Sequence, residues 1–385
     1  MRTIQISAFW LDGSPAQRFL NLLGAFLLSF LVACTTLPTQ EFGAYKEAFA
    51  KARAAGEDVL LDYGKAKEQC DVLQCVGRAS QSTKPSGSNP GGSMRPSISD
   101  ITAVTRTSQR VDHVAIRFRA WEVVARYNDS LTALAEGRSA QELGAAVGGL
   151  VQSLDSFPVD AIKDAVGSLA PFLGPLRILM VEAERERARQ LFLNAIEKEK
   201  ESNLINGEFI GHLLKADIED FWKIRYGLNN LQYKPLLDRI FDLTERFGKL
   251  ARRYQLTKDV NGQVGRINLA SARLPRLPDG KQPVEDLAIS QNTSIAPTPE
   301  VNEQLLAITS EIEELVEQAL KKNAELVAYK QVLIEYSKLL DQTSGNINKL
   351  RAAAQAARPT FQPSGELLDA VVSLRQAFLK YNAKE

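Results

Sequence analysis

The spacing of apolar and polar residues predicts helices along most of the chain, and its most regular stretch lies near the C-terminus. From Val301 to Leu340, apolar or aromatic side chains recur at alternating steps of four and three residues, and Lys322 is the one exception. This spacing places the side chains on one face of a helix of about 40 residues. The stripe is widened by further apolar residues at Leu306, Val316, Leu320 and Val327. It is therefore broader than a two-stranded seam, and we expect a monomeric bundle rather than an oligomeric coiled coil.

Other segments carry helical periodicity together with start signals. Ser139 and Glu142 have the spacing of a capping box, and Thr298 stands as a cap before a proline at the first helical position. Ser97 offers an N-cap for a helix that ends near residue 136. Further helices are expected at 41–77, 203–226, 228–254, 346–357 and 364–381. The sequence therefore predicts an all-α fold, an elongated multi-helix bundle with long, coiled-coil-like helices.

Two segments interrupt this pattern. Residues 79–96 are dominated by Ser, Gly and Pro, a composition typical of a flexible linker. Residues 257–299 contain Asn261-Gly262 between partly alternating segments, followed by several prolines. Asn-Gly in such a setting is a β-hairpin signal, but the flanking segments are polar. Both a small hairpin near 255–270 and an extended irregular loop are therefore open predictions.

Residues 143–181 form the most apolar part of the body and contain the runs GAAVGGLV and AVGSLAPFLGPLRILMV. One interpretation is a close-packed helical hairpin with breaks at Pro171 and Pro175. The other is a hairpin that acts on membranes. Charged residues interrupt the segment before any stretch reaches the ~18 uncharged residues of a bilayer span. This pattern favours the packed hairpin.

The N-terminus carries an apolar run, FLNLLGAFLLSFLVA, that is too short for a comfortable bilayer span. It ends in Leu31-Val32-Ala33-Cys34, and in these residues the segment resembles a bacterial lipoprotein signal with its lipobox. The resemblance covers residues 1–34 only. It implies cleavage before Cys34, a diacylglycerol thioether on that cysteine, and membrane attachment through the lipid. The residue after the lipidated cysteine is Thr35, whereas Asp at this position is associated with retention in the inner membrane. The resemblance therefore favours attachment to the periplasmic side of the outer membrane.

Cys70 and Cys75 are the thiols that would remain in the mature body beside Cys34. On an unbroken helix their Cα atoms would lie too far apart for a disulfide, so a bond requires the helix to end near Leu73. The pair lacks the CxxC spacing of redox and metal sites. We expect a structural disulfide in an oxidising compartment.

These features divide the chain into a signal peptide at 1–33, a lipidated N-terminus with a first helix at 34–78, the linker at 79–96, a helical bundle at 97–256, the irregular segment at 257–299 and C-terminal helices at 300–385. The whole chain has 47 basic and 46 acidic residues, and without the signal the two are equal in number. This balance gives no electrostatic reason to expect nucleic acid as a partner.

Motifs for catalysis or cofactor binding are absent from the sequence. It contains no Gly-rich phosphate loop, HExxH, CxxC or GxSxG, and its two histidines, His113 and His212, stand apart. The run EAERERARQ from Glu182 predicts a solvated helix face with ion pairs three residues apart. We expect no metal or cofactor and a lipid-anchored, non-enzymatic structural or interaction component of the cell envelope, with an envelope protein as partner. A membrane-perturbing protein using residues 143–181 and an enzyme acting on wall or lipid material are the alternatives.

Overall fold

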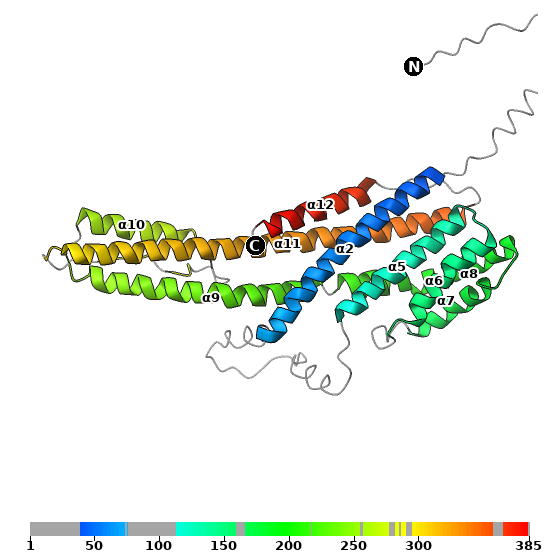
Figure 1. Ribbon diagram of the computed structural model, residues 1–385, viewed down its shortest axis with the longest axis horizontal. Coiled ribbons are helices and arrows are strands. Elements are labelled where there is room, and N and C mark those ends of the chain that lie inside the picture. The colour runs from blue at the N-terminus through cyan, green and yellow to red at the C-terminus, as the bar shows by residue number, and fades with distance from the viewer. Residues whose placement is uncertain are drawn as a thin grey trace, which may run out of the picture.

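The computed structural model describes residues 39–73, 75, 113–158, 166–216, 218–254, 257–276, 282–284, 286–289, 295–356 and 365–383. Cys34, the predicted linker at 79–96 and the predicted cap at Ser97 lie outside these residues. The described elements are helices only, which confirms the all-α prediction (Figure 1). They are α2 (Thr39–Leu73), α5 (His113–Ala135), α6 (Ala140–Asp155), α7 (Val166–Leu179), α8 (Arg185–Ser202), the π-helix η2 (Leu204–Lys215), α9 (Ile218–Ala251), α10 (Lys258–Ala272), α11 (Pro299–Gln355) and α12 (Gly365–Asn382).

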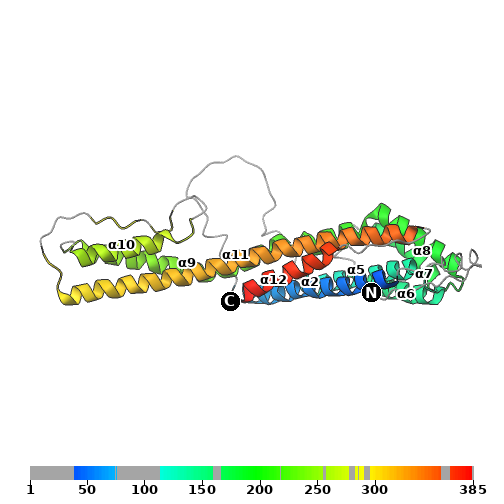
Figure 2. The ribbon, with the colours of Figure 1, turned by 90° about the horizontal axis from the view of Figure 1, so that it is seen from above.

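The helices pack around two main hydrophobic cores that lie one after the other along the molecule. The larger core joins α2, α5 to α8, η2, the start of α9, the second half of α11 and α12, and we call this part the bundle. The smaller core joins α10 to residues 233–251 of α9 and 301–320 of α11, and we call these three segments the arm. Figures 1 and 2 show the arm projecting from one end of the bundle. The long helices α9 and α11 connect the two parts.

Helix α11 confirms the predicted stripe and extends beyond it. Its 57 residues span about 85 Å at the usual helical rise. Thr298 caps the helix through its hydroxyl, which accepts a hydrogen bond from the Val301 N–H at 3.4 Å. Most of the stripe is buried, with its first half in the arm core and its second half in the bundle core: Leu305, Ile308, Ile312, Ala319, Tyr329, Leu333, Tyr336 and Leu340.

The separate helix expected at 346–357 is instead the last part of α11. Thr343, Ile347 and Leu350 are fully buried and continue the inward face at helical spacing. Gly345 lies on the exposed side, where the cost of a mid-helix glycine is only about 1 kcal/mol. Packing of the inward face therefore outweighs the glycine, and the helix does not end there.

The predicted hairpin near 255–270 is wrong, because α10 occupies this region. Thr257 caps α10, and its hydroxyl accepts a hydrogen bond from the Val260 N–H at 3.3 Å. Val260 and Ile267 are fully buried and lie seven residues apart on the face that packs into the arm core. Gly262 of the Asn-Gly pair points into open space on the other face. The helical burial of one face thus overrides the local turn signal.

Two further predicted breaks are absent from the structure. Helix α9 runs through residue 227, where the sequence suggested a gap between two helices. Helix α7 contains both Pro171 and Pro175 without ending at either. These prolines lie on its outer side, exposed and half-buried respectively, where water can satisfy the carbonyl groups that a proline leaves unpaired.

The predicted apolar hairpin is present as α6 and α7, and most of its apolar side chains pack within the bundle, while Ile178, Met180 and Val181 are exposed. The glycines of α6 admit close approach, since a Cβ atom at Gly144 would lie 3.6 Å from the carbonyl oxygen of Met180. Among the described helices, none is long and apolar enough to cross a membrane. The fully buried side chains of the hairpin are Val147 and Leu150 of α6 and Phe172, Leu176 and Leu179 of α7.

Candidate functional site

A groove with a volume of about 760 Å³ lies between α2 and α12. Its apolar wall combines Leu374, Phe378 and Leu379 of α12 with Leu61 of α2. Leu61 and Leu379 are 52% and 70% exposed, so apolar surface faces solvent on both sides of the groove. Charged side chains of both signs complete the lining: Asp58, Asp62, Lys65, Arg225 and Arg375. The groove therefore combines exposed apolar side chains with charged side chains of both signs.

The deep side of the groove is built around Arg225 of α9. Its Nη2 donates to Oδ1 of Asp62 of α2 at 2.6 Å, and both side chains are less than a fifth exposed. The guanidinium carbon lies 5.0 Å from the ring centre of Tyr329 of α11 and 5.2 Å from that of Tyr381 of α12. Cation–π contacts of this kind strengthen when water is excluded. One arginine thus ties four helices together beneath the groove.

The ionisable groups around Arg225 are not arranged for proton transfer at neutral pH. Burial raises the pKa of the Tyr329 phenol, so this side chain stays neutral and cannot serve as a base. The carboxylate of Asp62 is engaged by the guanidinium through a charge-assisted hydrogen bond. The arrangement therefore holds the deep side of the groove in a fixed shape.

A second buried ion pair lies inside the bundle, away from the groove. Arg351 of α11 pairs with Glu199 of α8, which is fully buried. Tyr127 of α5 accepts a hydrogen bond from Arg351 Nε at 3.0 Å and donates to Glu199 Oε2 at 3.1 Å. The other carboxylate oxygen accepts the backbone N–H of Ile205 at 3.0 Å, which fixes the start of η2. These contacts hold four elements in register, and none of these residues lines the groove.

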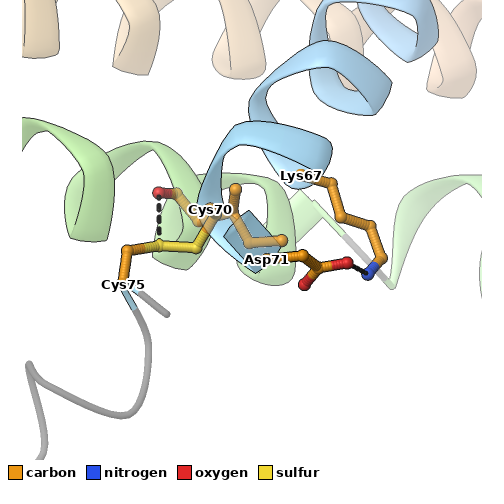
Figure 3. The surroundings of a disulfide bond; sticks show 5 residues. Lys67, Cys70, Asp71 and Cys75 are labelled. Atoms are coloured by element: carbon orange, nitrogen blue, oxygen red, sulfur yellow. Dashed lines mark hydrogen bonds and ion pairs between the residues drawn. A yellow bond between two sulfur atoms is a disulfide. The ribbon is translucent and has the colours of Figure 1, made fainter. Parts of the chain in front are cut away.

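The predicted cysteine pair is bonded in the structure, at the end of α2 (Figure 3). The described part of α2 reaches Leu73, and the Cα atoms of Cys70 and Cys75 lie 5.0 Å apart, within the range of a disulfide. The Cys75 sulfur contacts the carbonyl oxygen of Ile224 at 4.0 Å. A Cβ atom at Gly227 of α9 would lie only 3.1 Å from the Cys75 sulfur. The glycine therefore makes room for the disulfide. Cys70 and Cys75 are buried, so the disulfide is a local link at the end of α2 that packs against α9.

His212 and the charged run from Glu182 lie on the surface, whereas the side chain of His113 lies outside the described part of the structure. His212 is exposed and its Nδ1 lies 3.0 Å from Glu208 of the same helix. Glu186 pairs with Arg189 at 3.6 Å, three residues along, as the EAERERARQ run predicts. Glu182 pairs with Arg187 and not with the residue three along, because α8 begins only at residue 185 and Glu182 lies before the helix. In the part of the chain that the structure describes, no group of three or more His, Cys, Asp or Glu side chains could hold a metal ion.

Asp62, Arg225, Glu199 and Arg351 are important residues that the sequence did not single out. The available signal was a charged residue within an inward-facing helical stripe, as for Arg351 beside Ile347 and Leu350.

A comparison with protein-family models, with curated proteins and with solved structures found no match.

Proposed function

We propose that the protein is a lipid-anchored rod of the bacterial cell envelope, attached through Cys34 to the periplasmic face of the outer membrane. It acts as a non-enzymatic interaction component that binds a partner protein in the groove between α2 and α12. The observation that carries this proposal is the position of the start of α2. This helix begins at the end of the bundle that is opposite to the arm (Figure 1).

Contacts near the start of α2 support this placement. Lys46, in its second turn, lies 3.7 Å from Glu136, which directly follows the last residue of α5. The first described turns of α2 therefore lie beside the turn between α5 and α6. Five residue steps separate Cys34 from Thr39, a chain length that reaches at most about 18 Å. A lipid on Cys34 would hold this end of the bundle close to the membrane and leave the arm directed away from it.

The partner we assign to the groove is an amphipathic helix of another envelope protein. The groove wall on α12 carries the exposed Leu379, and the same helix exposes Leu368 and Val372 at helical spacing. Such a row of apolar side chains fits the apolar face of a partner helix. Asp58 on one side and Arg375 on the other can pair with its polar flanks. Most apolar side chains of α6 and α7 are buried within the bundle, which weighs against the membrane-perturbing alternative for the hairpin as a whole, although Ile178, Met180 and Val181 at its end are exposed.

The test places a photo-crosslinking amino acid at Leu61 or Leu379 in cells. Leu269 of α10 is the matched control, since it is 71% exposed but lies in the arm. We expect one defined crosslinked product from both groove positions and none of that product from the control. The Cys34→Ala variant should lose its attachment to the membrane fraction. Equal crosslinking at all three positions would contradict the groove as the partner site, and unchanged attachment would contradict the anchor.

A further inference from the structure

The end of the bundle that lies opposite the arm is formed by two turns that touch each other. The turn between α5 and α6 covers residues 136–139, and the turn between α7 and α8 covers residues 180–184. Arg185 connects them, because its Nη2 donates to the carbonyl oxygen of Gly137 at 2.5 Å. We call these two turns, with the side chains around them, the bundle tip.

A cationic pocket with a volume of about 540 Å³ opens at the bundle tip. Arg138, Arg185 and Arg189 line it, with Glu186 as the one carboxylate of that lining. Arg138 directs its Nε to a carboxylate outside this lining, Glu136, at 2.6 Å. Among the described residues, no carboxylate forms an ion pair with Arg185. Arg189 pairs with Glu186 at 3.6 Å, so Arg185 is the arginine of this lining that keeps its charge without a carboxylate partner in the described part of the chain.

Two further features of the pocket fit an anionic ligand. Helix α8 begins there, its N-cap residue Glu184 makes no side-chain hydrogen bond to the first turn, and the Glu184 N–H donates to Oε1 of Glu182 at 3.1 Å. The N-terminal N–H groups of a helix favour anions. The floor of the pocket is apolar, with the following residues beneath the arginines: Leu134, Ala135, Ala140, Leu143, Ala354 and Ala356. A ligand with an anionic group attached to an apolar part matches this lining.

Exposed apolar side chains stand beside the pocket. Ile178, Met180 and Val181 are 53%, 45% and 85% exposed at the end of α7 and in the turn that follows. Three large apolar residues at a protruding turn are suited to the boundary between headgroups and acyl chains of a bilayer. Neighbouring arginines would bind lipid phosphates through charge-assisted hydrogen bonds.

We propose that the bundle tip is a membrane-contact surface. Its cationic pocket binds the headgroup of an anionic phospholipid through Arg138, Arg185 and Arg189, while Ile178, Met180 and Val181 enter the bilayer interface. The inference rests on the proposed function in one respect, because the proposed lipid anchor is what turns the bundle tip toward the membrane. The contact itself needs no lipid on Cys34, so the two proposals are separable.

The test uses the lipid-free chain from Thr35 to Glu385, which keeps every buried residue of both cores. Its partitioning is measured by co-sedimentation with phosphatidylcholine vesicles that contain or lack phosphatidylglycerol. We expect binding only with phosphatidylglycerol, and an Arg185→Gln variant should bind about fivefold more weakly, the usual effect of one basic residue near an anionic surface. Val181→Ser should also weaken binding.

Matched controls lie on the arm. Arg273→Gln removes an arginine whose side chain is 53% exposed, and Leu269→Ser removes an apolar side chain that is 71% exposed. Both controls should bind vesicles as the unchanged chain does. Equal losses in tip and arm variants, or equal binding to both vesicle types, would overturn the inference. Stabilisation by glycerol phosphate without any vesicle binding would also overturn it, in favour of a soluble anion.

The outcomes also separate this inference from the proposed function. A chain that binds anionic vesicles through the tip, but whose Cys34 carries no lipid in cells, would support the tip and contradict the anchor. An acylated Cys34 together with no vesicle binding by the lipid-free chain would support the anchor and contradict the tip.

Discussion

Arg351 of α11 and Glu199 of α8 form an ion pair in the interior of the bundle, where the carboxylate is fully shielded from water. Burial raises the pKa of Glu199, and the nearby charge of Arg351 partly opposes that rise. A carboxyl group with a raised pKa contributes stability below its unfolded value of about 4.3 and loses it as the pH rises through its folded value. The ionised carboxylate of Glu199 is therefore stabilised in the interior by the charge of Arg351.

We expect Arg351→Met to lower the free energy of unfolding by roughly 3–5 kcal/mol at neutral pH, because it leaves a buried carboxylate without its partner. The loss should shrink as the pH falls below neutral, because the raised pKa of Glu199 lets the carboxyl take up a proton and it then no longer needs the arginine. Urea unfolding of both proteins across this pH range measures the difference.

The control for this pair is the double variant Glu199→Gln with Arg351→Met. It removes both charges and keeps an amide that can still accept the Ile205 N–H, so it should recover most of the lost stability. A loss in the single variant that does not change with pH would show that Arg351 acts through packing alone.

Gly56 of α2 lies against Trp121 of α5, and a Cβ at this position would meet the indole Cζ2 at 2.6 Å. We expect Gly56→Ala to lower the free energy of unfolding by about 1–3 kcal/mol through overpacking. Gly262→Ala is the matched helical control, because no atom lies within 4 Å of its would-be Cβ. That variant should be more stable by about 0.5–1 kcal/mol. Thermal unfolding of the two variants in parallel measures both changes. A change in stability of the same sign in both variants would contradict the close approach of α2 and α5.

The disulfide between Cys70 and Cys75 should be present in protein isolated from the periplasm. In denaturant, an alkylating reagent should label these cysteines only after reduction, as read by mass spectrometry. Replacing both with alanine should cost about 2 kcal/mol, since the loop is short. Full labelling without a reductant would show that the thiols are free and would contradict the disulfide.

The inward stripe of α11 gives the clearest test of the helical packing. Ile312 is fully buried in the arm core, and we expect Ile312→Ala to cost about 2–5 kcal/mol. Glu314 lies on the exposed face of the same turn, and Glu314→Ala should change stability by no more than about 0.5 kcal/mol. Chemical denaturation distinguishes the two, and similar losses would be inconsistent with the observed register of the helix.

The periodicity of the sequence was sufficient for the architecture wherever one face of a helix is continuously apolar. The α11 stripe and the capping box at Ser139 and Glu142 are both present as expected. Local signals failed where packing opposed them. Asn261-Gly262 lies within α10, and residue 227 lies within α9, because burial of the neighbouring residues outweighs the propensity of a glycine.

The candidate sites depend on contacts between distant helices, which the spacing of residues along the sequence does not predict. Asp62 and Arg225 come from separate helices, as do Glu199 and Arg351, and each pair meets only when the bundle closes. The arginine-rich run before and within α8 was expected to be a solvated surface. Its Arg185 instead reaches the turn after α5, a contact that depends on how α6, α7 and α8 stack.

We expect the rod to stand on the membrane by its bundle tip, with the arm directed away. The most direct measurement is energy transfer from a dye on the mature, lipidated protein to acceptor lipids in vesicles. Labels attached through Glu184→Cys at the tip and Glu300→Cys at the start of α11 mark exposed positions near the two ends of the molecule. Transfer should be strong from the tip label and weak from the arm label, because α11 alone is about 85 Å long. Equal transfer from both labels would show that the molecule lies flat, and stronger transfer from the arm label would show that it faces the other way; either result would contradict this orientation.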